Sequence, residues 1–199
     1  MQDRRVEVLE RSLAYDGYFK ILRYRFRHAT FTGGMSPEMT REVFERGHAA
    51  AVLPYDPGRD FVVLVEQFRI GALDSPYDPW LLEPVAGIIE AGETPAEVAR
   101  REAEEEAGLE ILDLIPACEY FVSPGGATER CRVFIGRIDA QGAGGLFGHA
   151  GEGEDIRAHV VPFAEVMDWL EGGRLVVAST VVALQWLALH RDEVRARWR

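Results

Sequence analysis

The stretch "TPAEVARREAEEEAG", residues 94–108, predicts a helix with both ends marked, and the rest of the fold is inferred outward from it. Thr94 is a candidate N-cap, and Glu97 completes a capping box with it. Pro95 suits the first helical position, where its missing N–H has no partner to lose. Gly108 is a natural C-terminal stop, because glycine readily adopts the left-handed conformation that ends many helices.

The second half of this helix carries four glutamates, which repel one another by a few tenths of a kcal/mol per pair at helical spacing. At about 100° per residue, Glu102 and Glu106 share one face, one turn apart, and Glu105 lies beside them. Glu104 points away from this stripe. Carboxylate oxygens are the ligands that hard divalent cations prefer. Helical spacing alone, however, is more typical of a solvated acidic face than of a metal site.

Composition limits the classes of protein to consider. The chain has 199 residues, of which 47% are apolar, so it is long enough for one packed domain and an extra subdomain. The formal net charge of −11 argues against nonspecific binding to nucleic acid, which needs a basic surface. It leaves room for a small anionic substrate bridged by a divalent cation. Cys118 and Cys131 form no metal-ligand pattern and are expected to be reduced.

We expect a cytoplasmic protein without membrane association. The first residues, "MQDRRVEVLE", lack the apolar core of a signal peptide. The longest apolar run, residues 175–189, is shorter than a membrane span of about 20 residues and contains Ser, Thr and Gln. This run is therefore interpreted as a buried helix.

The remaining segments alternate between strand and helix signals. Apolar side chains alternate with arginines along residues 21–28, which is the period of a strand with one apolar and one basic face. Residues 141–155 contain six glycines and are expected to form a long, mobile loop. Together these signals predict an α/β sheet covered by helices. Further strands are expected within 41–56, 61–70, 129–139 and 158–163, and further helices within 164–173 and at the C-terminal end.

From Gly87 onward the chain follows the pattern G-x5-E-x7-R-E-U-x-E-E-x-G-U, where U is apolar. This pattern resembles the signature of the Nudix hydrolases at every fixed position, with nine specified positions in 23 residues. The resemblance implies a Nudix-type α/β/α sandwich with a mixed sheet over residues 49–199. It also implies an N-terminal antiparallel β subdomain over residues 1–48, used for dimerisation and substrate contacts. The matching residues are Gly87, Glu93, Arg101, Glu102, Ala103, Glu105, Glu106, Gly108 and Leu109.

The Nudix resemblance assigns a role to each acidic residue of the motif. It implies that Glu102, Glu106 and the carbonyl of Ala86 bind Mg²⁺ or Mn²⁺, with Glu105 as an auxiliary, catalytic carboxylate. Metal ions at this position would neutralise a diphosphate, stabilise the leaving oxygen and activate water. The resemblance also implies that Arg101 pairs with a glutamate before the helix to orient it. That glutamate is the second fixed position of the motif.

Stretches outside the motif resemble one branch of the family, the ADP-ribose pyrophosphatases. These stretches include "FERGHAAAVLPYD", "VEQFR", "PWLLEPVAG" and "GEGEDIR", and Pro124 follows Gly108 by sixteen residues. The branch hydrolyses ADP-ribose to AMP and ribose 5-phosphate, usually as a homodimer whose sites borrow residues from the partner. Its attacking water is activated by a glutamate on a mobile loop, which here matches Glu152, with Glu154 as a further metal ligand; the reverse assignment stays open.

The same resemblance implies a set of contacts to ADP-ribose. Phe19 would stack on adenine, arginines would bind phosphate through forked, charge-assisted bonds, and Glu129 would accept hydrogen bonds from ribose hydroxyls. Three alternatives stay open: hydrolysis of another nucleotide sugar or NADH, a catalytically silent ligand sensor, and an RNA-cap hydrolase. The implied substrate contacts are Tyr18, Phe19, Arg41, Glu42, Arg46, Arg69, Ile88, Ser123, Pro124, Gly125 and Glu129.

Overall fold

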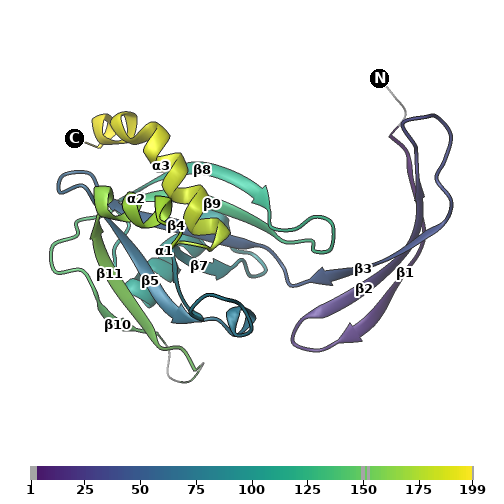
Figure 1. Cartoon of the computed structure of the whole chain (residues 1–199), viewed down its shortest axis with the longest axis horizontal. Helices are drawn as coiled ribbons and strands as arrows, with labels where there is room; N and C mark the ends of the chain where they lie inside the picture. The colour runs from purple at the N-terminus through teal and green to yellow at the C-terminus, as the bar shows by residue number, and fades with distance from the viewer. Residues whose placement is uncertain (1–3, 149–150, 152, 199) are drawn as a thin grey trace. The chain divides into compact units, whose positions relative to one another are not determined.

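The computed structural model describes residues 4–148, 151 and 153–198, and it divides into two compact units. The smaller unit, here called the N-terminal unit, combines Met1–His48 with Phe121–Arg130. The larger unit, here called the core unit, combines Ala49–Tyr120 with Cys131–Arg199. Each unit has a sheet of its own (Figure 1).

The N-terminal unit is an antiparallel three-stranded sheet in the order β1-β2-β3 (Figure 1). Along β2, Leu22, Tyr24 and Phe26 are buried or half-buried while the arginines between them are exposed. The predicted alternation of apolar and basic faces in this strand is therefore confirmed. The strands are β1 (Val6–Asp16), β2 (Lys20–His28) and β3 (Met39–Glu45).

The second segment of the N-terminal unit, Phe121–Arg130, attaches to β3 through backbone hydrogen bonds at Phe44. The N–H of Phe44 donates to the carbonyl of Gly126 over 2.8 Å, and its carbonyl accepts from the N–H of Thr128 over 3.1 Å. A turn that begins at Ser123 precedes this contact, since the carbonyl of Ser123 accepts from two following N–H groups. This segment thus belongs structurally with the N-terminal strands, although it lies far from them in sequence.

The core unit contains a mixed sheet, because β4 pairs in parallel with β9 and antiparallel with β5 and β7. Its main path runs β10-β11-β5-β4-β9-β8, with β6 paired to β5 and β7 paired to β4. The strands are β4 (Ala49–Asp56), β5 (Phe61–Phe68), β6 (Trp80–Glu83), β7 (Val85–Ile88), β8 (Asp113–Phe121), β9 (Arg130–Arg137), β10 (Gly145–Phe147) and β11 (Ile156–Pro162).

Helices cover both faces of this sheet, which confirms the predicted α/β/α sandwich. Alternate residues of β4 enter two different apolar clusters, as the period of a strand requires. Leu53 packs with the C-terminal helices, whereas Val52 packs with the helix of the acidic motif. The helices are η1 (Ile70–Ala72), α1 (Pro95–Ala107), α2 (Phe163–Glu171) and α3 (Ala178–Arg197), seen around the sheet in Figure 1.

Several predicted boundaries differ from the structure. The segment 41–56 holds two strands, β3 and β4, which are separated by residues 46–48, where Gly47 has a φ of +82°. The loop expected over 141–155 contains the short strand β10, which pairs with β11. Strands β1 and β8 are not among the individual strands expected from the sequence, although β1 lies within the predicted β subdomain. Among the described residues, no helix is long and apolar enough to cross a membrane, and most of the apolar run 175–189 lies in α3.

Candidate functional site

Helix α1 is fixed at both ends by the predicted signals. The Thr94 side chain accepts from the N–H of Glu97 over 3.3 Å, and the Glu97 carboxylate accepts from the N–H of Thr94 over 2.7 Å. At the other end Gly108 adopts the left-handed conformation, with φ +62°. The caps fix where α1 begins and ends, whereas its buried apolar side chains set which side faces the sheet and therefore where its glutamates lie.

Glu106 is the most buried carboxylate of α1, with only 5% of its surface exposed. Its Oε2 accepts a hydrogen bond from the backbone N–H of Ala86 on β7 over 3.1 Å. Burial raises the pKa of Glu106 to about 8, helped by the charges of Glu102 and Glu154 and opposed by the Ala86 N–H and Arg69. A buried carboxyl group of this kind ionises near neutral pH only where a cation compensates its negative charge.

Glu102 lies directly against the backbone of Gly87 on β7. A Cβ placed on Gly87 would be 1.7 Å from the Oε1 atom of Glu102, so no other residue fits there without displacing the carboxylate. Burial raises the pKa of Glu102, Arg101 opposes this rise, and Glu105 and Glu154 add to it. The predicted ligands Ala86, Glu102 and Glu106 are thus brought together where α1 meets β7.

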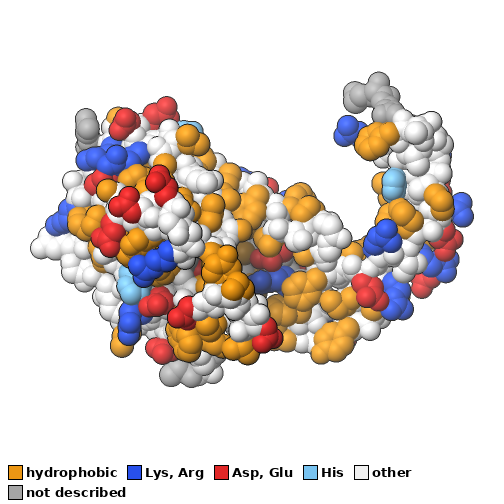
Figure 2. All heavy atoms as spheres, viewed as in Figure 1, with side chains coloured by type: hydrophobic (Ala, Val, Ile, Leu, Met, Phe, Trp, Pro, Cys, Tyr) orange, Lys and Arg blue, Asp and Glu red, His pale blue; other side chains and the backbone are white. Residues whose placement is uncertain are grey.

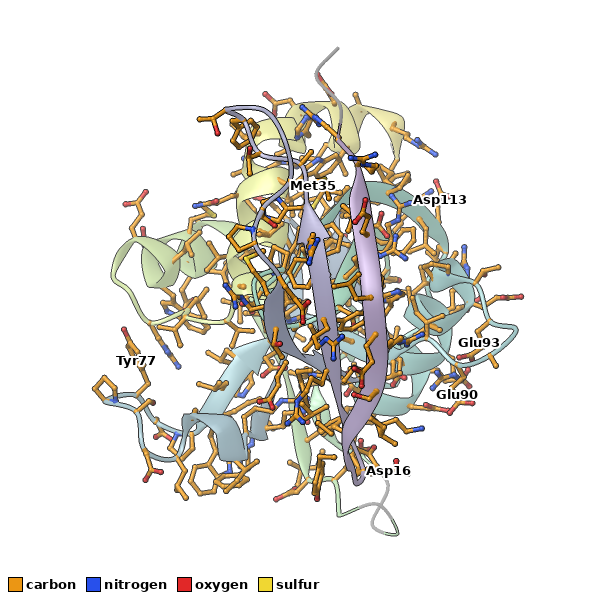
Figure 3. All side chains as sticks on the ribbon, turned by 90° about the vertical axis from the view of Figure 1, so that its right-hand side faces the viewer. Asp16, Met35, Tyr77, Glu90, Glu93 and Asp113 are labelled. Atoms are coloured by element: carbon orange, nitrogen blue, oxygen red, sulfur yellow. The ribbon has the colours of Figure 1, made fainter. Side chains whose placement is uncertain are left out.

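Arg101 binds three carboxylates at once. Its Nε donates to Oε1 of Glu93 over 3.1 Å, which is the pair expected from the motif. Its Nη1 donates to Oε1 of Glu102 over 2.8 Å and to Oε2 of Glu105 over 3.0 Å. Figure 3 shows Glu93 beside Glu90 on the loop before α1, and the N–H of Glu90 donates to Glu93 over 3.0 Å. One guanidinium thereby offsets much of the repulsion in the acidic run.

Arg69, which follows β5, is held by Glu83 at the end of β6. The Nε and Nη2 atoms of Arg69 donate to Oε1 and Oε2 of Glu83 over 3.0 and 2.8 Å. Burial acts to lower the pKa of Arg69, but the hydrogen bonds and charge of Glu83 raise it, and Glu106 and Glu154 add to the rise. Arg69 therefore lies within electrostatic reach of the α1 carboxylates. Sequence reasoning missed Glu83, whose only signal is a lone acid among apolar neighbours.

Glu154 is half-buried and acts electrostatically on Glu102, Glu106 and Arg69, so it belongs to the same region. Gly148 lies close to Glu154, because a Cβ on Gly148 would be 2.9 Å from Cβ of Glu154. Glu152, the predicted general base, lies outside the described residues. The exposed Glu104 faces away from these carboxylates, as predicted.

The donor chemistry of this region fits a hard divalent cation, because the buried Glu106 and the half-buried Glu102, both with raised pKa values, lie against the backbone of Ala86 and Gly87. Within residues 4–148, 151 and 153–198, no three His, Cys, Asp or Glu side chains are already arranged as a metal cluster. Instead, Arg101 forms ion pairs with Glu102 and Glu105. Binding a cation here would require these carboxylates to turn toward it.

A second group of predicted residues meets within the N-terminal unit. The ring of Phe19 makes edge contacts with Tyr18 at 4.7 Å and with Phe44 at 5.1 Å between centroids. The guanidinium of Arg46 lies 5.3 Å from the Phe19 ring centre and 3.5 Å from a carboxylate oxygen of the buried Glu129. Aromatic, cationic and acidic groups therefore lie together here.

The other predicted substrate residues are placed differently. Arg41 donates to the carbonyl of Thr40 over 2.8 Å, and Glu42 pairs with Arg23 over 2.8 Å, both at exposed positions on β3. Residues 123–125 form the exposed turn of the N-terminal unit. Ile88 ends β7 in the core unit, where it pairs with the first residue of β4.

The signature residues, their geometry and the sandwich agree with the comparisons to known proteins. The NUDIX domain family matches residues 45–179, and the chain belongs to this family. It is 51% identical over 193 residues to the ADP-ribose pyrophosphatase of Escherichia coli K12, covering 97% of this chain and 92% of that protein. The corresponding protein of Haemophilus influenzae is 42% identical, over 98% and 91% of the two chains.

Two further proteins resemble this chain at lower sequence identity. A GDP-mannose pyrophosphatase of Pectobacterium atrosepticum is 32% identical over 90% of this chain and 92% of that protein. A solved structure described as an ADP compounds hydrolase superposes with a TM-score of 0.68 at 22% identity, covering 98% of each chain. At that identity the structural likeness establishes the fold alone.

Proposed function

We propose that this chain is a divalent-cation-dependent ADP-ribose pyrophosphatase that hydrolyses ADP-ribose to AMP and ribose 5-phosphate. The observation that carries the proposal is the meeting of Glu102 and Glu106 with the backbone of β7, within electrostatic reach of Arg69. The two relatives of that name at 51% and 42% identity support the substrate. We also propose a cytoplasmic location, because a chain of this size with only two cysteines does not depend on a disulfide framework.

Within this proposal, Glu102, Glu106 and the carbonyl of Ala86 hold Mg²⁺, for which Mn²⁺ can substitute. The cation, when bound, neutralises the diphosphate and lowers the pKa of water. Glu105 is assigned an auxiliary role beside Glu102, because Arg101 already holds both carboxylates in one orientation. Arg69 contributes a fixed positive charge toward the diphosphate, since an arginine fork matches phosphate oxygens.

We assign the general base to Glu152 and a further metal contact to Glu154. The support for Glu154 is its electrostatic effect on Glu102 and Glu106. Glu152→Gln is expected to lower kcat by about 10²–10⁴-fold, the usual contribution of a general base, without weakening metal binding. Near-normal turnover in this variant, with a large loss in Glu154→Gln, would reverse the two assignments.

The nucleoside end of the substrate is assigned to the N-terminal unit. Phe19 offers an aromatic face for adenine, and Arg46 and Glu129 offer a donor and an acceptor next to it. Tyr18, with 90% of its surface exposed, is available for the same contact. The remaining contacts proposed for ADP-ribose are Arg41, Glu42, Ile88, Ser123, Pro124 and Gly125.

We further propose that the protein is a homodimer. In the three strands of the N-terminal unit only Leu22 is buried among the apolar residues, which is too little for an independently stable sheet. Val6, Val8, Leu13 and Tyr15 of β1 are largely exposed, and apolar side chains are visible on this unit in Figure 2. Sedimentation analysis of Val8→Asp tests this: the proposal predicts dissociation, and an unchanged monomeric mass in wild type and variant contradicts it.

A substrate panel with Mg²⁺ and product identification tests the proposed activity. We expect ADP-ribose to give the highest kcat/KM, with AMP and ribose 5-phosphate as products. The second candidate substrate is GDP-mannose, which is favoured by the relative of that name at 32% identity. A clear preference for GDP-mannose or NADH, or no turnover of any nucleotide sugar, would overturn the proposal.

A further inference from the structure

The Arg69–Glu83 ion pair has a geometry that serves more than the stability of the sheet. Both oxygens of Glu83 accept from Arg69, over 3.0 and 2.8 Å, so the guanidinium is fixed in direction as well as in place. The Glu83 carboxylate is buried, with 7% of the residue exposed, whereas the Arg69 side chain is 43% exposed. Glu83 therefore holds Arg69 from the interior of the protein, while the guanidinium of Arg69 extends toward solvent.

Both residues are also held by their backbones. Glu83 lies opposite Val65 in the pairing of β6 with β5, and the N–H of Arg69 donates to the carbonyl of Pro79 over 2.8 Å. The two strands of one hairpin therefore set the separation of the two side chains. An arginine side chain held in this way loses less conformational freedom when a ligand binds than an unrestrained arginine does.

The ion pair with Glu83 leaves some N–H donors of the Arg69 guanidinium for a ligand. An arginine carries five N–H donors, and Glu83 takes two of them, one from Nε and one from Nη2. Three donors remain, two of them on Nη1. The charges of Glu106 and Glu154 also act on Arg69, so the guanidinium lies within electrostatic reach of carboxylates proposed to hold the cation.

We propose that Glu83 is a positioning residue for catalysis, which acts through Arg69 by holding the guanidinium so that its remaining donors meet the diphosphate of the substrate. This inference rests on the proposed function. A competing role can be stated from the same contact: Glu83 competes with the diphosphate for Arg69 and weakens substrate binding. A third role is structural alone, in which the pair only fastens β6 to β5.

A double-mutant cycle on kcat/KM for ADP-ribose separates these roles. Glu83→Gln keeps the shape of the side chain and removes the charged fork. The positioning role predicts a loss of about 10–100-fold in kcat/KM, the usual scale for a group that orients a ligand-binding residue. In an Arg69→Gln background the same change is expected to have less than about a 2-fold effect, because Glu83 acts only through Arg69.

Glu66→Gln is the matched control, because Glu66 is a partly buried acid on the adjacent strand that pairs with His159 over 2.8 Å. We expect its kcat/KM to stay at the wild-type value. A gain in kcat/KM in Glu83→Gln would overturn positioning in favour of competition. Equal losses in the wild-type and Arg69→Gln backgrounds, or a fall in Tm with unchanged kcat/KM, would overturn it in favour of a structural role.

Arg69→Gln leaves a buried carboxylate without its cation, so that variant has the greatest risk of not folding. If Arg69→Gln does not fold, the Glu83→Asp variant tests the positioning role instead. Aspartate keeps the charge but is one methylene shorter, so positioning predicts a clear loss in kcat/KM at a Tm near that of wild type. Wild-type kcat/KM in Glu83→Asp would overturn the proposal.

The failure of the proposed function gives a different result. If the wild-type protein does not hydrolyse ADP-ribose, the proposed activity is wrong, and the same variants are then compared by calorimetric binding of inorganic pyrophosphate with Mg²⁺. Positioning still predicts about 10–100-fold weaker binding in Glu83→Gln and no change in Glu66→Gln. Unchanged or tighter pyrophosphate binding in Glu83→Gln would overturn the positioning role.

Discussion

Gly87 leaves space that is filled by the carboxylate of Glu102, since a Cβ on Gly87 would lie 1.7 Å from Oε1 and 2.2 Å from Cδ of that side chain. The first glycine of the motif is therefore required by a side chain fifteen residues later. The clash involves the far end of a flexible side chain, so a larger residue at this position would move the carboxylate more readily than the fold.

We predict that Gly87→Ala lowers activity much more than stability. The displaced Glu102 carboxylate is expected to reduce kcat by about 10–100-fold, while the Tm changes little. Gly71→Ala is the control, because nothing lies within 4 Å of a Cβ at that position. Normal turnover in Gly87→Ala would show that the placement of Glu102 does not matter.

Arg101 is predicted to substitute for a cation when none is bound. Arg101→Met leaves Glu93, Glu102 and Glu105 without their shared partner, and it should lower the free energy of unfolding by about 1 kcal/mol in EDTA, a value reduced for solvent exposure. Mg²⁺ should raise the Tm of this variant more than that of wild type, because repulsion among the carboxylates is then relieved by the ion.

The control for Arg101 is its neighbour Arg100, whose Nη1 donates to the carbonyl of Ile111 and, among the described residues, to no carboxylate of the site. Arg100→Met should lose stability by an amount that does not depend on Mg²⁺. An equal response of both variants to the ion, measured by thermal unfolding, would contradict the role assigned to Arg101.

The raised pKa of Glu106 predicts how stability depends on pH in the metal-free protein. Its carboxyl has a pKa of about 8 in the folded state and 4.5 as its ordinary value, so the folded state binds the extra proton between these limits. The Glu106 contribution to the free energy of unfolding should therefore fall as pH rises from about 4.5 to 8, by up to about 1 kcal/mol per pH unit, and then stay level.

Urea unfolding in EDTA at several pH values measures this effect as the difference between wild type and Glu106→Gln, which does not titrate. The advantage of the glutamine variant should grow toward pH 8 and shrink when Mg²⁺ is present for wild type. Parallel profiles of the two proteins would rule out the raised pKa.

Gly108 has a second function beyond ending α1. Its φ of +62° disfavours other residues by about 1–2 kcal/mol, and a Cβ there would also lie 2.6 Å from the ring of Phe147 on β10. Gly108→Ala should therefore lower the free energy of unfolding by more than the backbone strain alone. In a Phe147→Ala background the same change should be smaller by about 1 kcal/mol, the low end of what overpacking costs. Equal values in both backgrounds, from urea unfolding, would exclude the ring contact.

Local signals made α1 and much of the core predictable from the sequence. The caps of α1 depend on Thr94, Glu97 and Gly108, which are neighbours in the chain, and the same holds for the alternation along β2. Helical spacing likewise placed Glu102 and Glu106 on one face and directed Glu104 away from it, and Glu104 is exposed. The Nudix resemblance supplied what spacing could not, namely the meeting of these glutamates with Ala86.

Contacts between distant residues were not predictable in this way. Glu83 joins Arg69 only because β6 pairs with β5, and Phe147 meets Gly108 only because β10 is added at the edge of the sheet. β10 lies in a segment whose glycines predicted a loop, since glycine weakens strand signals even where a partner strand is present. Likewise, the attachment of Phe121–Arg130 to β3 depends on tertiary hydrogen bonds at Phe44.

The most direct test of the central claim is the turnover of ADP-ribose by three matched variants of one helix, Glu102→Gln, Glu104→Gln and Glu106→Gln, with Mg²⁺ present. Each removes one charge from α1, so a general effect of charge or helix stability would appear in all three. The account predicts that kcat/KM falls by about 10²-fold or more in Glu102→Gln and Glu106→Gln and stays unchanged in Glu104→Gln. Similar activity in all three variants would contradict it.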